Sequence, residues 1–435
     1  MSEERSTLRY IDWRELCPWL LILKSFRLAV GIRVLVLAFA GLLASTAGWD
    51  LIGWAFGGSS DVQLQTWISQ DTAWPGYLLF PSLTPETRTA MPTGAAHSLV
   101  PSGLPNPDGD PMPAGLPSLS PDSLINNSFF STVWKRFSLP FVRIFNLDMT
   151  FARLAYLLLI CLWSLLVWSL FGGAIVRLSA VALAREDRLP LRPALGFAQR
   201  KWFGLFAAPL FPFIGVFLAA IPLCLVGLLF NLNFFVALSV VIWPFVLLAG
   251  IFMAILLLGL LFGWPLMWGT IGTEGTDAFD ALSRSYNYIR EKPLHYLFYI
   301  LVAAGIGALG SVLVALFAYA IIHLATWGVN WGMPSQRITE IYNTSDSFGR
   351  NAMGFWNGCV YGFAVACLIG YFWSAMAAVY LLMRKKVDAT ELDEVYVEEE
   401  EQPYGMPPLV TDSSGVPRVA DTPPSEPGPL AEEQE

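Results

Sequence analysis

The sequence predicts an all-α, polytopic helical membrane protein, with about six transmembrane helices and short cytoplasmic amphipathic helices. About 20 consecutive apolar residues in a helix cross the hydrocarbon core of a bilayer, and a helix satisfies its own backbone hydrogen bonds there. The hydrophobic fraction is 55% and the charged fraction only 14%, whereas a soluble domain carries about a quarter charged residues. Six apolar runs are long enough to span, near residues 34–56, 154–182, 204–229, 234–268, 295–325 and 355–383.

Residues 1–33 are predicted to form a cytoplasmic N-terminal lead with a helix lying in the membrane interface. Lys24 and Arg27 fall on one face of this helix, and apolar residues recur on another. The alternative is a plain extension of the first transmembrane helix, residues 34–56. The recurring apolar residues are Leu16, Leu20, Leu23 and Phe26.

Residues 57–152 are predicted to form a Pro/Ser/Gly-rich extracytoplasmic loop. Eleven prolines fall between residues 75 and 121, with many serines and glycines. Such a composition cannot bury enough apolar surface to fold, so we expect most of this loop to be irregular or disordered.

Residues 153–383 are predicted to form a five-helix membrane bundle. The run 234–268 would make a helix of roughly 52 Å at 1.5 Å per residue, and it contains Pro244 and Pro265. Two spans there would move the next loop to the outside, against its positive charge. We favour one long, kinked helix, and two spans remain the alternative.

Charge in the connecting segments predicts that both termini are cytoplasmic, in a plasma membrane that we expect to be a bacterial inner membrane. Cation-rich segments stay on the cytoplasmic side. Residues 185–201 hold five cations and the last run ends in Arg384-Lys385-Lys386, whereas Asn231-Leu232-Asn233 is uncharged. Six spans place every cation-rich segment inside and every cation-poor segment outside.

Residues 384–435 are predicted to form a disordered, acidic cytoplasmic tail. From Asp388 onward there are fourteen acidic residues and one basic residue, Arg418, which gives a local net charge of −13. The total of −8 therefore leaves +5 on the rest of the chain. A simple solvating tail is one interpretation, and a docking site for a basic partner is the other. Nothing in this distribution favours nucleic-acid binding.

Two stripes of small residues predict close packing between the last two spans. Residues four apart share a helix face, and small side chains there let another backbone approach. Self-association or a sliding gate is the functional alternative. The stripe of the last span is Gly354, Gly358, Gly362, Ala366 and Gly370, and that of the fifth span begins with Ala303, Gly307 and Ser311.

The sequence offers no catalytic, cofactor-binding or metal-ligating pattern. His97, His295 and His323 share no ligand spacing, and there is no phosphate-binding loop or nucleophile elbow. We interpret the acids Glu274, Asp277 and Asp280 as capping a helix N-terminus. Arg33 and Arg177, near the cytoplasmic ends of two spans, are expected to extend their charged groups toward water.

The stretch from Thr273 to Tyr286, TEGTDAFDALSRSY, resembles a segment of uncharacterised bacterial multi-pass membrane proteins. Those proteins include relatives of the membrane domain attached to some glycerophosphodiester phosphodiesterases. In that pattern an acidic residue and glycine precede Ala-Leu and Arg-Ser, ahead of an apolar helix. The match covers about fourteen residues and the flanking spans, without the soluble phosphodiesterase domain. The resemblance therefore implies a helical membrane module with no assigned reaction.

These features favour a non-enzymatic membrane module that organises protein partners or lipids. Its expected partners are the lipid bilayer and a protein that contacts the tail or the cytoplasmic amphipathic helices. The alternative is a transport or channel subunit for a neutral or lipid-like solute. The scarcity of charge within the runs argues against an ion-coupled transporter.

Overall fold

The computed structural model describes residues 17–71, 142–145, 149–334, 337, 348–396, 409–411 and 417–419. The chain divides into two units, Met1–Val395 and Tyr396–Glu435. Among these described residues, the first unit holds six helices that are long and apolar enough to cross a membrane. The predicted all-α, polytopic membrane fold is therefore confirmed.

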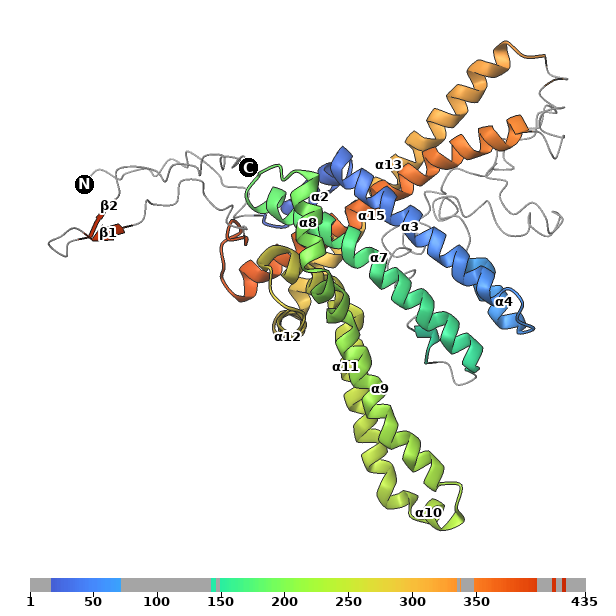
Figure 1. Cartoon of the computed structure of the whole chain (residues 1–435), viewed down its shortest axis with the longest axis vertical. Helices are drawn as coiled ribbons and strands as arrows, with labels where there is room; N and C mark the ends of the chain where they lie inside the picture. The colour runs from blue at the N-terminus through green and yellow to red at the C-terminus, as the bar shows by residue number, and fades with distance from the viewer. Residues whose placement is uncertain are drawn as a thin grey trace, which may run out of the picture. The chain divides into compact units, whose positions relative to one another are not determined.

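The long helices of the first unit form three hairpins (Figure 1). In each hairpin one helix leaves a common junction and its partner returns to that junction. Helices α3 and α7 form the first pair, α9 and α11 the second, and α13 and α15 the third. The long helices are α3 (Ile32–Phe56), α7 (Phe151–Ala184), α9 (Trp202–Leu229), α11 (Ser239–Glu274), α13 (Pro293–Trp331) and α15 (Phe348–Val387).

Short helices connect and cover these pairs. Two of them, α8 and α12, lie between consecutive long helices at the junction, as the sequence predicts (Figure 1). The short helices are α2 (Leu20–Ala29), α4 (Val62–Asp71), α8 (Leu191–Arg200), α10 (Asn233–Ala237) and α12 (Ala278–Glu291).

Helix α15 is the centre of the first unit. It packs against α2, α3, α7, α11 and α13. Every residue in its most apolar 18-residue stretch is buried, whereas only 6% of the corresponding stretch of α11 is buried. Protein therefore surrounds the inner part of α15, while much of α11 is left to contact lipid.

The hairpin of α9 and α11 shows how burial is divided along a span. The buried residues of α9 lie between Leu205 and Val216, and those of α11 between Leu260 and Thr273. The remainder of α11, residues 239–259, has a length of roughly 31 Å. That length matches the hydrocarbon thickness of a bilayer, about 30 Å. One continuous helix thus occupies the region where the sequence left one or two spans open.

The N-terminal helix packs into the protein differently from the predicted interfacial helix. Helix α2 contacts α13 and α15, and its buried face carries Ile22, Ser25 and Ala29, while Leu23 is exposed. The ring of Phe26 lies edge-on to Tyr371 of α15. The apolar spacing identified the helix, but tertiary packing uses a neighbouring face.

Two further boundaries differ from the sequence prediction. Helix α4 lies inside the predicted irregular loop 57–152, whose proline-rich part falls outside the described residues. Helix α15 continues to Val387, and residues 388–395 belong to the first unit. The folded chain therefore extends beyond the predicted start of the tail at residue 384.

The second unit contains two short strands. Strand β1 (Leu409–Thr411) pairs antiparallel with β2 (Pro417–Val419), with Leu409 opposite Val419. This pair lies within the segment for which the sequence predicts disorder, and most of the other tail residues fall outside the described part of the chain.

Candidate functional site

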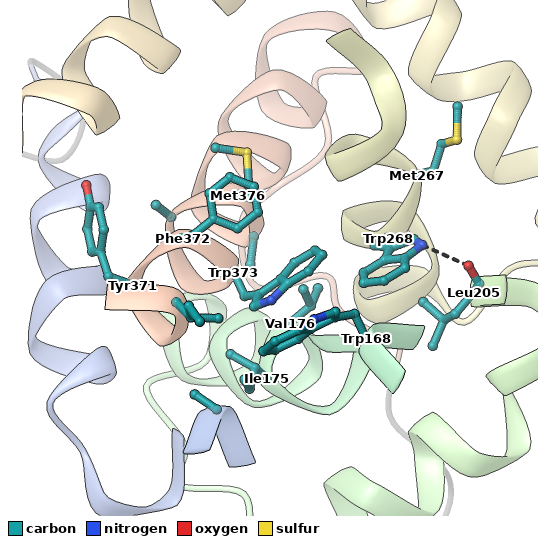
Figure 2. Packing of buried hydrophobic residues seen from close by; sticks show 14 of the residues in the cluster. Trp168, Ile175, Val176, Leu205, Met267, Trp268, Tyr371, Phe372, Trp373 and Met376 are labelled. Atoms are coloured by element: carbon teal, nitrogen blue, oxygen red, sulfur yellow. Dashed lines mark hydrogen bonds between the residues drawn. The ribbon is translucent and has the colours of Figure 1, made fainter. Parts of the chain in front are cut away.

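An aromatic cluster fills the junction between α7, α11 and α15. The rings of Trp268 and Trp373 stack with centroids 4.5 Å apart, and Trp168 stacks on Trp373 at 6.1 Å (Figure 2). Trp264 meets Trp373 edge-on at 5.6 Å. Gly172 on α7 makes this approach possible, because a Cβ there would lie 2.9 Å from both stacked rings. Stacked and edge-on aromatic pairs add to the stabilisation that burial provides.

Arg177 connects three helices next to this cluster. The sequence predicted that its charged group would extend to water, but the side chain is only 4% exposed. Its Nη1 donates to the carbonyl of Gly272 at 3.1 Å, and its guanidinium lies 4.4 Å from the ring centroid of Phe197 on α8. Gly272 is in the last turn of α11, where carbonyls lack intrahelical donors. Arg177 therefore caps α11 from a neighbouring helix.

The turn from α11 into α12 is built by Glu274-Gly275-Thr276-Asp277. Gly275 has φ 67°, a left-handed conformation that ends α11 and that glycine adopts without strain. Asp277 is the N-cap of α12, and its carboxylate accepts from the backbone N–H of Asp280 at 2.8 Å. The predicted capping role of Asp277 is confirmed.

Glu274 has a different role from Asp277, because its carboxylate points into a polar network. Its Oε2 lies 2.5 Å from Nη1 of Arg284 on α12, and its Oε1 accepts from the hydroxyl of Tyr380 on α15 at 2.5 Å. Arg384 adds a second cation, with Nη1 3.7 Å from Oε1. Arg284 also pairs with Asp280, one turn earlier on α12. This polar network therefore joins α11, α12 and α15.

The surroundings of the polar network raise the pKa values of two groups on α12, Arg284 and Tyr288. Burial opposes the charge on Arg284, but the charges of Glu274 and Asp280 outweigh it and raise its pKa. Burial, assisted by a hydrogen bond to Asp388, raises the pKa of Tyr288. Both oxygens of Glu274 are held by donors from other helices, so the carboxylate positions α11, α12 and α15 relative to one another.

Two arginines hold the chain that follows α15. We call residues 388–395 the strap. Arg384 donates from Nη2 to the carbonyls of Glu391 and Glu394 at 2.9 and 2.6 Å. Arg185, at the end of α7, donates to the carbonyls of Asp393 and Val395 at 3.2 and 3.3 Å. The strap is thus fixed through its backbone.

The predicted small-residue stripes lie in the interior wherever the structure describes their side chains. Gly358, Gly362, Ala366 and Gly370 are buried on α15, as are Ala303 and Gly307 on α13, while Ser311 is half-buried; the side-chain environment of Gly354 lies outside the description.

Near Gly370, the small-residue stripe of α15 lies against α3, the first span. A Cβ at Gly370 would lie 2.7 Å from Cγ1 of Val34 on α3. Contact with α13 runs instead through Tyr371, whose hydroxyl donates to the carbonyl of Ala303 at 2.7 Å. Packing of the two stripes against each other stays a prediction.

The histidines and acids contribute no clustered ligand set in the described chain. His323 stacks on Tyr319 with ring centroids 5.4 Å apart, His295 lies near the start of α13, and His97 falls outside the described residues. Among the residues that the structure describes, no group of three or more His, Cys, Asp or Glu side chains could hold a metal ion.

Helix α12 packs one face inward and leaves one large apolar side chain at the surface. Leu282, Tyr286 and Ile289 pack against the core, but Phe279 is 71% exposed. The hydroxyl of Tyr286 donates to the carbonyl of Leu256 on α11 at 2.6 Å. Helix α12 therefore lies along α11 and leaves Phe279 at the surface.

Together the three hairpins and their shared junction define a multi-pass helical membrane protein. No family model, curated protein or solved structure matches this chain.

Proposed function

We propose that this chain is a non-enzymatic membrane module that organises protein partners or lipids. The observation that carries this proposal is the enclosure of α15 by the helices that pack against it, with stacked tryptophans at the centre. Solute transport needs polar groups along a path between spans, whereas stacked aromatic side chains fill the contact between α7, α11 and α15. A firmly packed junction suits a scaffold whose function lies on its surfaces.

The contact surfaces that we propose are the cytoplasmic helices α8 and α12 and the acidic tail. Exposed Phe279 on α12 and the cations around α8 give these helices both apolar and charged groups. The resemblance of residues 273–286 to bacterial multi-pass modules without an assigned reaction supports the same proposal, as does a non-enzymatic interpretation of Glu274.

We place the junction on the cytoplasmic side of a bacterial inner membrane, with both termini inside. Arg185, Lys201 and Lys385 all lie at the junction ends of their helices. Cations retained on one side are the usual mark of the cytoplasmic face.

Crosslinking followed by affinity capture tests the proposal. The full chain is compared with a chain that ends at Tyr396, where the second unit begins. We expect a protein partner with the full chain and a weaker yield without the tail. If neither chain captures a partner or co-purifies a preferred lipid, and if proteoliposomes carry a neutral solute across the bilayer, the transport alternative replaces this proposal.

A further inference from the structure

We infer that the strap, residues 388–395, couples the acidic tail to the polar network that joins α11, α12 and α15. Four hydrogen bonds from Arg185 and Arg384 hold its backbone. The inference rests on the proposed role of the tail as a docking segment, because the strap joins residues 396–435 to the membrane helices.

The strap is a defined turn. Ala389 has φ 55°, in the left-handed region, and this reverses the chain directly after α15 ends. Val395 is 4% exposed, so an apolar side chain anchors the far end of the strap. The arginines bind the backbone carbonyl oxygens of four strap residues, which are Glu391, Asp393, Glu394 and Val395.

Arg384 is the point at which the strap meets the polar network. Its guanidinium is 4% exposed in an ion pair with Glu274 while it also donates to two strap carbonyls. Tyr288 of α12 adds a second connection, because its hydroxyl hydrogen-bonds the carboxylate of Asp388. Detachment of the strap would remove two acceptors from a buried arginine and one partner from Tyr288.

Loss of the strap contacts would weaken the attachment of α12. Arg384 without its carbonyls would have Glu274 as its remaining acceptor and would compete there with Arg284, the residue that ties α12 to α11. A partner that pulls the tail away from the junction would therefore loosen α12. Because α12 lies between two spans, the effect reaches the cytoplasmic ends of α11 and α13.

Hydrogen exchange on the full chain in nanodiscs tests this coupling without any partner. Arg185→Ala removes two of the four strap hydrogen bonds at an exposed position, so the fold should be retained. We expect exchange of the strap amides and of the α12 amides 281–288 to become three- to tenfold faster. The matched control, Arg188→Ala, lies in the same loop and should leave both unchanged.

A second variant tests whether the arginines hold the strap through its backbone carbonyls or through its acidic side chains. Substitution of Glu391, Asp393 and Glu394 by Ala removes three carboxylates but keeps every carbonyl that the arginines bind. We expect wild-type exchange in α12. Faster exchange in this variant, or unchanged α12 exchange in Arg185→Ala, would overturn the inference. Exchange that accelerates equally in α3 would also overturn it, because that result indicates general destabilisation. Failure to capture a partner leaves this measurement unaffected, so the two proposals fail separately.

Discussion

Trp268 on α11 donates its indole N–H to the carbonyl of Leu205 on α9, at 2.8 Å (Figure 2). In a regular helix that carbonyl would accept from the residue four positions later, which here is Pro209, and proline has no N–H. A neighbouring helix thus supplies the donor that the proline removes. In a membrane an unsatisfied carbonyl is costly, so a proline is tolerated where such a donor is available.

Replacement of Trp268 by Phe should lower the free energy of unfolding by about 1–3 kcal/mol, because the Leu205 carbonyl becomes unsatisfied while the ring remains. Addition of Pro209→Ala supplies an intrahelical N–H and should recover much of that loss. Thermal unfolding in detergent measures both effects. Trp327→Phe, at an exposed position of α13, is the control and should have no effect. Equal losses in the single and double variants would refute the role of the hydrogen bond.

The close approach of Gly370 to Val34 predicts that a larger side chain at position 370 destabilises the protein. Gly370→Ala would place a methyl group 2.7 Å from Cγ1 of Val34, and overpacking of this kind costs about 1–3 kcal/mol. Gly305→Ala is the matched control, because a Cβ there has no neighbour within 4 Å. We expect a lower melting temperature only for Gly370→Ala, with recovery when Val34→Ala is added. A melting temperature equal to that of the control would show that α3 moves aside freely.

The predicted packing role of the small-residue stripe is tested about two turns from Gly370. Gly362 is buried on α15, and Gly362→Leu should lower thermal stability in detergent or change the oligomer size, since a large side chain would separate packed helices. Gly305→Leu provides the comparison at an open position. Wild-type stability together with wild-type oligomer size would mean that this part of the stripe faces lipid.

Asp61 predicts acid sensitivity at the outer end of the first hairpin. Its carboxylate accepts from Nε and Nη2 of Arg153 at 2.6 and 2.7 Å, and this hydrogen bonding lowers its pKa from 3.8 to about 2. Because the folded pKa is the lower one, the stabilisation is complete above about pH 4 and is lost as the pH falls toward 2.

Thermal unfolding between pH 6 and pH 2 measures this loss. The wild-type protein should lose stability more steeply below pH 4 than Asp61→Asn does. Asp61 also caps α4, because its Oδ1 accepts from the backbone N–H groups of Gln63 and Leu64. The side-chain oxygen of asparagine can still accept these hydrogen bonds, so the two proteins differ in the ion pair with Arg153. Parallel pH profiles would contradict the assignment.

Arg177→Lys should destabilise the junction even though it keeps the charge. A lysine ammonium lacks the planar group that both donates to Gly272 and stacks on Phe197. We expect a loss of about 1–3 kcal/mol, the range for a hydrogen bond that involves a charged donor. Arg192→Lys, on the exposed surface, serves as the comparison. Similar small effects for both variants would show that Arg177 contributes only its charge.

The sequence predicted the spans well because each depends on local information. Apolar runs placed all six long helices, and the run 234–268 was correctly favoured as a single helix. The Asp277 cap was likewise visible, because the capping residue and its helix are adjacent in sequence. These features need no knowledge of which helices meet.

Long-range partners were beyond such reasoning. Glu274 was grouped with the capping acids, but its partners Tyr380 and Arg384 are more than one hundred residues away. Arg177 was expected at the water surface, because nothing near it in sequence announces Gly272 or Phe197. A buried cation is paired or hydrogen-bonded, so the presence of Arg177 within an apolar run was the one signal that could have indicated an interior partner.

The position of α15 has a consequence for biogenesis. Of the six long helices that the structure describes, this one is synthesised last, yet it occupies the middle of the finished first unit. The spans α3, α7, α11 and α13 must therefore be synthesised before the helix that they surround has left the ribosome. A chain truncated before residue 348 would expose to lipid the small and aromatic faces that α15 normally covers.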